Sequence, residues 1–452
     1  MKYVIVGSSH FGYEAVETIL EAQKDAEIHL YERGDKASFM SCGAQSYLEG
    51  ISQSPDELHY ANEGSYTDQG INVHLNSDVV GINPEAKTIT VKTENGEEEA
   101  SYDKLLLSPG GYAPKLNVPG KDLEHVYTFR GRDDAEIVKA RMEDAKKVVV
   151  IGGGYIGVEV AEAYVRNGQE VTLIDAVDRF LPTYLDSEFF QTLLAEAEDK
   201  GLTFKGNEFV QEVKDDNGVV TGVVTDKNEY EADTIIMAVG VRPDTAWLKD
   251  TLELDDKGFV VVNEYLETSV EDIYAGGDAT YVTFNPTGKE LPIGLATNAR
   301  KQGVTAAKNT LGEKVKAPGV NGTSGLAFFD LKFATTGLKD SLIDSYDGEV
   351  KTFYCTEKVR PSFMRDGDIT VDMKILYDAE TEVILGAQFL STEDITHAAN
   401  TLSLAVTAKM TLTDLAQADF FFQPGFSRPW NFLNVLALRA QGKTYGATKM
   451  LF

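Results

Sequence analysis

The stretch Lys146–Gly157, KKVVVIGGGYIG, decides the fold that this chain is expected to adopt. Its apolar first half predicts a buried β-strand, and its glycine-rich second half predicts a tight turn that leads into a helix. After that helix, a second apolar run, Val171–Ile174, ends at the acidic residue Asp175. A strand, a glycine-rich turn, a helix and a second strand ending in an acid together form a dinucleotide-binding unit.

The residues of this turn suit a nucleotide for physical reasons. Glycine adopts positive φ angles and lets the backbone approach a pyrophosphate, which then lies against N–H groups at the start of the helix. Asp175 can accept hydrogen bonds from a ribose 2′-hydroxyl and would repel a 2′-phosphate. The residues that follow it, Ala176 and Val177, supply no arginine to bind such a phosphate. The sequence therefore favours NAD over NADP.

A weaker copy of the same layout lies at the N-terminus. The apolar run Tyr3–Val6 ends in the turn Gly7–Gly12, GSSHFG, and a second apolar run ends at Glu32. Ser9 replaces the middle glycine of the motif. Because hydride transfer between a flavin and a nicotinamide needs a separate site for each, two such units predict one site of each kind. Asp278 is placed like a carboxylate that binds the ribityl chain of a flavin, although a simple turn residue would look the same.

The rest of the chain adds shorter elements. We expect strands at Thr88–Lys92 and Thr234–Val239, and near the C-terminus strands at Val371–Tyr377 and Glu382–Leu390 and a helix at about Ile395–Met410. The expected fold class is α/β, with two Rossmann-like dinucleotide-binding domains for FAD and NAD and a C-terminal α+β dimerisation domain. The expected boundaries are 1–114 and 244–318 for the FAD-binding domain, 115–243 for the NAD-binding domain and 319–452 for the C-terminal domain.

Composition narrows the class of protein. The chain has 452 residues and a formal net charge of −30, which makes binding to nucleic acid or to an anionic membrane improbable. Its two cysteines rule out a disulfide scaffold and fit a reducing compartment. No segment approaches the length of a membrane span. We expect a soluble, cytoplasmic protein without a metal ion.

Cys42 is a candidate redox residue. It lies in Ser38–Gly43, SFMSCG, just before a predicted helix at Ala44–Leu48, and a helix N-terminus stabilises a thiolate. Because no second cysteine lies nearby, its oxidised form would be a sulfenic acid or a mixed disulfide. A lone cysteine is more often inert, and we expect this of Cys355.

His10 and Arg300 have functional and plain structural interpretations. His10 follows the first glycine-rich turn, where the start of the helix disfavours the imidazolium, so a neutral ring could hydrogen-bond a reacting group or act as acid or base. A histidine that only packs against the loop would give the same pattern. Arg300, next to Lys301 on a predicted helix, would by default lie on a solvated face.

These residues and motifs together indicate a resemblance to a known protein family. The chain resembles the glutathione-reductase-like flavoproteins, and within them the branch of bacterial NADH peroxidases and water-forming NADH oxidases. The resemblance extends over essentially the whole chain. It is most specific at Ser38–Gly43 and is also carried by Gly7–His10, Gly152–Glu159, Tyr274–Asp278, Leu295–Gly303 and Ala418–Pro424.

The resemblance implies a role for each site residue. It implies that Cys42 cycles between thiolate and sulfenic acid beside the flavin, with His10 and Arg300 on the side of the oxidant, and that the C-terminal domain joins subunits of a homo-oligomer. The implied FAD contacts are Gly7, Ser8, Ser9, Gly12, Glu32, Ser108, Pro109, Gly110, Gly111, Arg130, Asp278, Gly294, Leu295 and Ala296. The implied NADH contacts are Gly152, Gly154, Tyr155 (a gate over the flavin), Ile156, Gly157, Asp175, Tyr184 and Gly240.

The resemblance leaves several activities open. The sequence Asn298–Gln302, NARKQ, and the Gly7–His10 loop are typical of the peroxidases. We therefore expect an FAD-dependent NADH peroxidase that reduces hydrogen peroxide to water through Cys42. The alternatives are a water-forming NADH oxidase that acts on O₂, a coenzyme A disulfide reductase, and a non-catalytic flavoprotein that senses NADH.

Overall fold

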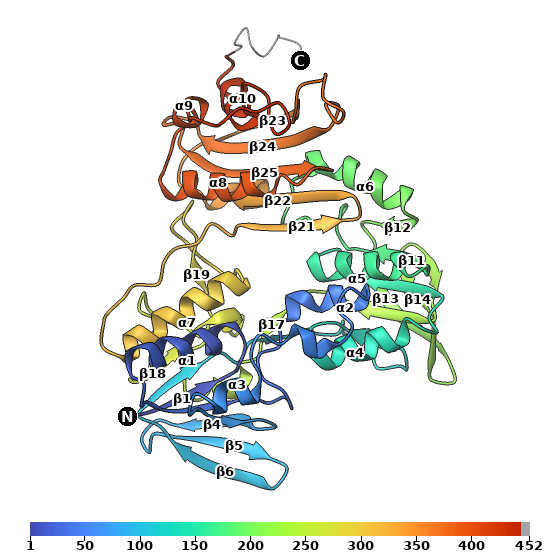
Figure 1. Cartoon of the computed structure of the whole chain (residues 1–452). Coiled ribbons are helices and arrows are strands. Elements are labelled where there is room, and N and C mark those ends of the chain that lie inside the picture. Colours follow the sequence, from blue (N-terminus) through green and yellow to red (C-terminus); the bar gives the residue numbers. More distant parts are fainter. Residues whose placement is uncertain (444–452) are drawn as a thin grey trace.

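The computed structural model describes residues 1–443; the end of the expected C-terminal domain, residues 444–452, lies outside the described part. Its first sheet has five parallel strands, and the chain leaves it after β7 and returns to it at β18. Helix α1 (His10–Ala22) follows β1 and packs against α7 (Ala296–Thr310), as Figure 1 shows. The strands in spatial order are β18 (Ile273–Ala275), β7 (Lys104–Leu107), β1 (Lys2–Val6), β2 (Glu27–Tyr31) and β3 (Asn72–His74).

A second five-stranded parallel sheet repeats this layout in the middle of the chain. Its strands in spatial order are β12 (Leu202–Lys205), β11 (Glu170–Ile174), β10 (Lys147–Ile151), β16 (Thr234–Met237) and β9 (Val126–Thr128). Its helices are α4 (Arg132–Arg141), α5 (Tyr155–Arg166) and α6 (Phe190–Asp199). Helix α5 begins directly after the glycine-rich turn, because Gly154 is its N-cap residue.

Smaller elements are inserted between the strands of the two parallel sheets or follow the last of them. Two antiparallel three-stranded sheets are formed by β4 (Asp78–Asn83), β5 (Thr88–Thr93) and β6 (Gly96–Ser101), and by β13 (Val210–Asp216), β14 (Val219–Thr225) and β15 (Glu229–Glu231). Short antiparallel pairs are β8 (Gly111–Tyr112) with β17 (Arg242–Pro243) and β19 (Val282–Thr283) with β20 (Glu290–Leu291). The short helices are α2 (Ala44–Leu48) and α3 (Glu63–Thr67).

The C-terminal part is an antiparallel sheet with helices. Its strands in spatial order are β21 (Ser324–Phe328), β22 (Leu331–Gly337), β25 (Ile384–Ser391), β24 (Thr370–Asp378) and β23 (Val350–Lys358). Its helices are α8 (Thr396–Thr407), α9 (Leu412–Ala416) and α10 (Phe432–Ala440). The two parallel-sheet units and this α+β unit confirm the predicted fold class.

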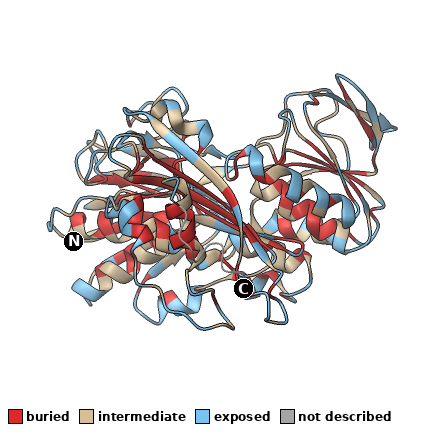
Figure 2. Ribbon diagram, turned by 90° about the horizontal axis from the view of Figure 1, so that it is seen from above, coloured by how far each residue is buried: buried red, intermediate tan, exposed pale blue. Residues whose placement is uncertain are grey.

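The buried residues follow the strands and the inner faces of the helices (Figure 2). One apolar cluster crosses the units: it joins Ala44 and Leu48 of α2 to the second parallel sheet and to Phe333 and Leu390 of the C-terminal sheet. Helix α2 lies against α4 and α5, although it comes from the N-terminal part of the chain (Figure 1). The turn that carries Cys42 is therefore held beside the second unit.

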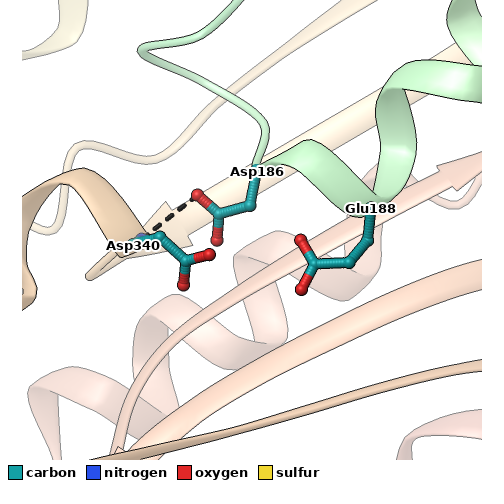
Figure 3. A group of neighbouring side chains, drawn as sticks. All are labelled: Asp186, Glu188 and Asp340. Carbon is teal, nitrogen blue, oxygen red and sulfur yellow. Dashed lines mark hydrogen bonds between the residues drawn. The ribbon is translucent and has the colours of Figure 1, made fainter.

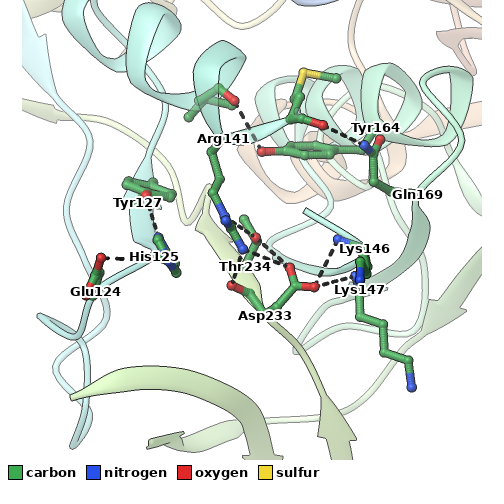
Figure 4. A network of polar contacts seen from close by, with 12 residues as sticks. Glu124, His125, Tyr127, Arg141, Lys146, Lys147, Tyr164, Gln169, Asp233 and Thr234 are labelled. Atoms are coloured by element: carbon green, nitrogen blue, oxygen red, sulfur yellow. Dashed lines mark hydrogen bonds and ion pairs between the residues drawn. The ribbon is translucent and has the colours of Figure 1, made fainter. Parts of the chain in front are cut away.

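A polar network at the start of β16 connects elements of the second sheet (Figure 4). The carboxylate of Asp233 accepts hydrogen bonds from the backbone N–H groups of Lys146 and Lys147, at 2.9 and 3.1 Å. Arg141 on α4 donates to the Asp233 carboxylate at 3.3 Å and to the hydroxyl of Thr234 at 2.9 Å. One acid thus connects two neighbouring strands and a helix below the nucleotide-binding turn.

Candidate functional site

The first glycine-rich turn is shaped by close backbone approach. Gly7 has a φ of +93°, and a Cβ atom there would lie 2.2 Å from the carbonyl oxygen of Ser108. Ser8 is buried, and its N–H and hydroxyl donate to one carboxylate oxygen of Glu32 at 3.1 and 2.5 Å. Ser9 is the N-cap residue of α1. The turn therefore points the start of a helix toward the space between β1 and β7, as an anion-binding turn does.

This turn lines a cavity of about 570 Å³. Its wall also contains the cationic side chains Arg33, Lys36 and Arg132, which the sequence analysis did not single out. Cations and helix-start N–H groups suit the pyrophosphate of a dinucleotide, so the residues fit FAD. The predicted residues that line the cavity are Gly7, Ser8, Ser9, Glu32, Ser108, Pro109, Gly110, Gly111 and Arg130.

The second turn repeats the same design. Gly152 has a φ of +104°, and a Cβ atom there would lie 2.4 Å from the carbonyl oxygen of Ala238. Asp175 accepts hydrogen bonds from the N–H groups of Gly153 and Val177, at 2.5 and 3.0 Å. This turn opens into a cavity of about 1100 Å³. The predicted residues that line it are Gly152, Gly154, Tyr155, Ile156, Asp175, Tyr184 and Gly240, together with Arg130, Asp278 and Gly294.

Four predicted contact residues line neither cavity. A Cβ atom on Gly12 would lie 1.9 Å from the carbonyl oxygen of Gly7, and one on Gly157 would lie 1.8 Å from that of Gly152. These two glycines therefore let each helix approach its own turn. Leu295 is the N-cap residue of α7 and Ala296 is the first residue of that helix.

Arg130 lines both cavities, and it pairs with Asp278, which lines the larger one. The guanidinium of Arg130 donates to Asp278 at 2.5 Å and to the carbonyl oxygen of Gly111 at 3.3 Å. Asp278 lies in a 3₁₀ turn, Gly277–Ala279, which Gln302 of α7 fixes by accepting a hydrogen bond from the N–H of Gly277 at 2.8 Å. Gln302 is a site-supporting residue that the sequence analysis did not assign, because its side chain reaches a turn more than twenty residues away.

Aromatic side chains cover one wall of the larger cavity. The rings of Tyr155 and Tyr184 stack with centroids 3.6 Å apart and planes 18° apart. The hydroxyl of Tyr155 donates to that of Ser324, from the C-terminal unit, at 3.0 Å. The position at the start of α5 is the one expected for a gate, and the gating role stays a prediction.

Cys42 is exposed and lies in a 3₁₀ turn, Ser41–Gly43, immediately before α2. The expected helix is present, but the expected stabilisation of the thiolate is wrong. Desolvation by the surrounding protein raises the pKa of the thiol, and the charge of Glu159 raises it further. A hydrogen bond to the Cys42 backbone and the charge of Arg300 act in the opposite direction. Desolvation is the largest of these effects, so the pKa of the thiol lies above its usual value.

His10 and Arg300 lie in one cluster with Tyr13, Glu14 and Tyr60. Desolvation lowers the pKa of His10, and the charge of Arg300 lowers it further, so the ring is neutral as expected. Arg300 is partly exposed but has protein partners: it forms an ion pair with Glu14, and its guanidinium carbon lies 5.1 and 4.9 Å from the ring centroids of Tyr13 and Tyr60. Sequence reasoning missed Tyr13, Glu14 and Tyr60, although Tyr13 and Glu14 lie one helical turn after His10 and so share its face of α1.

A group of acidic side chains lies between the second unit and the C-terminal unit. The carboxylates of Asp186, Glu188 and Asp340 face one another (Figure 3), which is an arrangement that can bind a cation. The ammonium group of Lys374 lies among them, 3.1, 2.8 and 2.6 Å from their oxygens. A protein cation therefore already compensates these charges.

Comparison with known proteins agrees with this architecture. Residues 1–303 match the pyridine nucleotide-disulphide oxidoreductase family, and residues 323–432 match the dimerisation domain of the same family. The chain therefore belongs to the pyridine nucleotide-disulphide oxidoreductases, which lie within the glutathione-reductase-like flavoproteins that the motifs predicted. It is an oxidoreductase, and its cofactors are FAD and NADH, as the sequence predicted.

Several individual proteins are similar to this chain over nearly its whole length. An NADH oxidase of Enterococcus faecalis is 42% identical over 445 residues, which cover 97% of this chain and 99% of the relative. The structure of a water-forming NADH oxidase from Lactobacillus brevis, bound to NADH, is 37% identical, with a TM-score of 0.94 and 98% of both chains covered. A CoA-dependent NAD(P)H sulfur oxidoreductase of Pyrococcus furiosus is 31% identical over 448 residues, 96% of this chain and 98% of the relative. Among residues 1–443, no helix is both long and apolar enough to cross a membrane.

Proposed function

We propose that this protein is a water-forming NADH oxidase, which uses two NADH molecules to reduce one O₂ to two water molecules. The full-length similarity to proteins named NADH oxidase carries the proposal. The geometry fits it, because Arg130 lines both cavities and Ser41, next to the exposed Cys42, lines the first one. The neutral ring of His10 lies within the influence of the Arg300 charge. These relatives favour the oxidase. The motifs around His10 and Arg300 had instead favoured the peroxidase.

The proposed cofactor sites follow the two turns. FAD would bind along the Gly7 turn with its ribityl chain at Asp278, and NADH would bind along the Gly152 turn with its adenosine ribose at Asp175. Bound FAD would supply the transfer of two electrons from NADH to O₂, which with one proton gives NAD⁺ and hydrogen peroxide.

We further propose that segments 1–114 and 244–318 form the FAD-binding domain, 115–243 the NAD-binding domain and 319–452 the domain that joins subunits, in a cytoplasmic enzyme.

Cys42 would remove the hydrogen peroxide. Its thiolate attacks one peroxide oxygen, the O–O bond breaks, and the second oxygen leaves as hydroxide while Cys42 becomes a sulfenic acid. The hydroxide takes a proton and leaves as water. The hydride of a second NADH, which carries two electrons, then converts the sulfenic acid to a thiolate and the second water.

His10 and Arg300 would act on the leaving oxygen. A neutral imidazole can donate its N–H to the departing oxygen, and the Nδ1 atom of His10 is buried without a hydrogen-bond partner among the described residues. The guanidinium of Arg300 would stabilise the developing negative charge. The same arrangement would serve an NADH peroxidase, which is the second candidate. A peroxidase would carry out only the reduction of hydrogen peroxide at Cys42, without the preceding reduction of O₂.

Substitution of Cys42 tests the proposal. Cys42→Ser should still oxidise NADH in air, but it should release hydrogen peroxide because the second step is lost. Cys355→Ala is the matched control, since Cys355 is buried in the C-terminal sheet, where burial raises its pKa to about 11. It should form water as the wild type does. If Cys42→Ser still forms water without releasing peroxide, Cys42 has no part in the reaction and the proposal is wrong.

A further inference from the structure

Tyr60 lies where the groups of the oxidant side meet. It belongs to the loop between a 3₁₀ turn (Pro55–Leu58) and α3, and it is half-buried. Its ring stacks on the imidazole of His10, with centroids 5.1 Å apart and planes 14° apart. The guanidinium carbon of Arg300 lies 4.9 Å from the centroid of the same ring. One aromatic ring thus touches both side chains that are proposed to act on the oxidant.

The three partners come from different parts of the chain. His10 is the first residue of α1, Arg300 lies on α7, and these two helices pack side by side (Figure 1). Tyr60 reaches them from a loop, and the ring of Tyr13 closes the cluster at its edge, 5.2 Å from the Tyr60 centroid. The loop therefore adds an aromatic surface to a pair of side chains that come from the two helices.

Each contact has a physical effect. A cation over an aromatic ring is stabilised by the ring quadrupole, and together with the Glu14 ion pair this restricts the guanidinium of Arg300. A ring stacked on an imidazole removes water from one of its faces. Desolvation is the largest cause that lowers the pKa of His10, followed by the charge of Arg300, while Asp278 and Glu14 act in the opposite direction.

The hydroxyl of Tyr60 makes a weaker contact with its neighbours than the ring does. It donates to the hydroxyl of Ser9 at 3.4 Å, which is a long and weak hydrogen bond. Desolvation raises the pKa of Tyr60 to about 12, so the phenol stays protonated at neutral pH. The ring and the hydroxyl can therefore be tested separately.

We propose that Tyr60 is a positioning residue, whose ring fixes the imidazole of His10 and the guanidinium of Arg300 in one orientation beside Cys42. The role in turnover rests on the proposed function, because both partners act there on the leaving oxygen. The placement of His10 and Arg300 by the Tyr60 ring does not rest on the proposed function, since it follows from contacts within this chain alone.

The test compares Tyr60→Phe with Tyr60→Leu in the FAD-loaded enzyme. The titration of His10 is followed by NMR of the imidazole, with the signal identified by its loss in His10→Gln. Tyr60→Phe keeps the ring, so His10 should titrate as in the wild type. Tyr60→Leu admits water to the imidazole, so the midpoint should move upward toward the ordinary histidine value of about 6.5. Tyr13→Leu is the control, because Tyr13 contacts Arg300 and Tyr60 in the cluster but does not stack on His10.

Kinetics supply the second readout. Tyr60→Leu should lower kcat/KM for hydrogen peroxide about tenfold to a hundredfold, because misplaced groups lose effective concentration, while Tyr60→Phe stays near the wild type. The proposal is overturned if Tyr60→Leu leaves both the His10 titration and kcat/KM unchanged. It is also overturned if Tyr60→Phe is as damaging as Tyr60→Leu, since the hydroxyl would then be the important group. If the wild type reduces no peroxide, the proposed function fails, and the His10 titration still decides the placement.

Discussion

Glu159 on α5 is a carboxyl group with an unusual environment. Desolvation, together with the nearby charges of Glu162 and Glu49, raises its pKa to about 7. Its own charge raises the pKa of Cys42 in turn. At neutral pH the protein thus holds a partly protonated carboxyl group whose charge acts on Cys42.

Replacing this group gives a prediction about stability. In the unfolded chain Glu159 ionises at its ordinary pKa of 4.5, and in the folded chain it ionises only near 7. The free energy of unfolding of the wild type therefore falls as the pH rises from about 4.5 to about 7, and it is unaffected by this group below that window. Glu159→Gln should remove this cost and raise the melting temperature at pH 8 while leaving it unchanged near pH 4.5. The gain should be on the order of 1 kcal/mol, since solvent screens a partly exposed group. Equal melting curves at both pH values would contradict the assignment.

At the scale of residues, the sequence predicted the properties of some site residues correctly and missed or misjudged those of others. His10 was expected to be neutral and is, but the causes are desolvation and the charge of the distant Arg300 rather than the start of the helix alone. Tyr60 was not found, because its contacts with His10 and Arg300 join residues far apart in the chain and no motif marks it. The expected low pKa of Cys42 was wrong, because a sequence pattern shows the start of a helix but not the desolvation around it.

At the scale of elements, the two glycine-rich turns were predictable, because a positive φ and a close backbone contact leave only glycine suitable. The strands were found, but their ends shifted: the strand expected at Thr234–Val239 ends at Met237, and the helix expected at Ile395–Met410 spans Thr396–Thr407. Lys409 adopts a φ of +52°, which ends the helical conformation before Met410. Composition does not reveal such a local backbone change.

The first turn can be tested with a matched pair of glycines. Gly7 and Gly168 both have a φ of +93°, but only at Gly7 would a Cβ atom meet another group, the Ser108 carbonyl oxygen at 2.2 Å. Gly168→Ala should cost only the left-handed conformation of alanine, about 1–2 kcal/mol. Gly7→Ala should also push the turn away from β7 and reduce the FAD retained on purification, measured by the absorbance ratio at flavin and protein wavelengths. Equal flavin content in both variants would show that the turn does not shape the flavin site.

At the scale of the whole molecule, buried contacts hold the units together. The apolar cluster that includes α2 spans all of them, and the Lys374 group joins the second unit to the C-terminal sheet. The side chain of Lys374 is 1% exposed, and although burial opposes its charge, hydrogen bonds with Asp340, Glu188 and Asp186 raise its pKa. None of these long-range contacts follows from local sequence patterns, whereas the order of the units does, because each unit carries its own motif.

Two lysine substitutions compare a buried with an exposed connection. Lys374→Met would leave three carboxylates without their shared cation, so it should lower the free energy of unfolding by about 2–3 kcal/mol, given that Glu188 and Asp340 are partly exposed. Lys200→Met is the control: Lys200 on the second unit pairs with Asp330 at 2.6 Å, but both side chains are more exposed. It should change the free energy of unfolding much less, because solvent screens an exposed ion pair. Thermal melting of the FAD-loaded protein measures both, and an equal effect of the two changes would contradict this account.

The measurement that tests the central claim most directly is the stoichiometry of the reaction in air. NADH absorbance, dissolved O₂ and released hydrogen peroxide are followed together in one wild-type sample. The account predicts that two NADH are consumed for each O₂, and that no hydrogen peroxide accumulates. Consumption of one NADH per O₂ with an equal yield of peroxide, or negligible O₂ uptake beside rapid anaerobic oxidation of NADH by added peroxide, would contradict it.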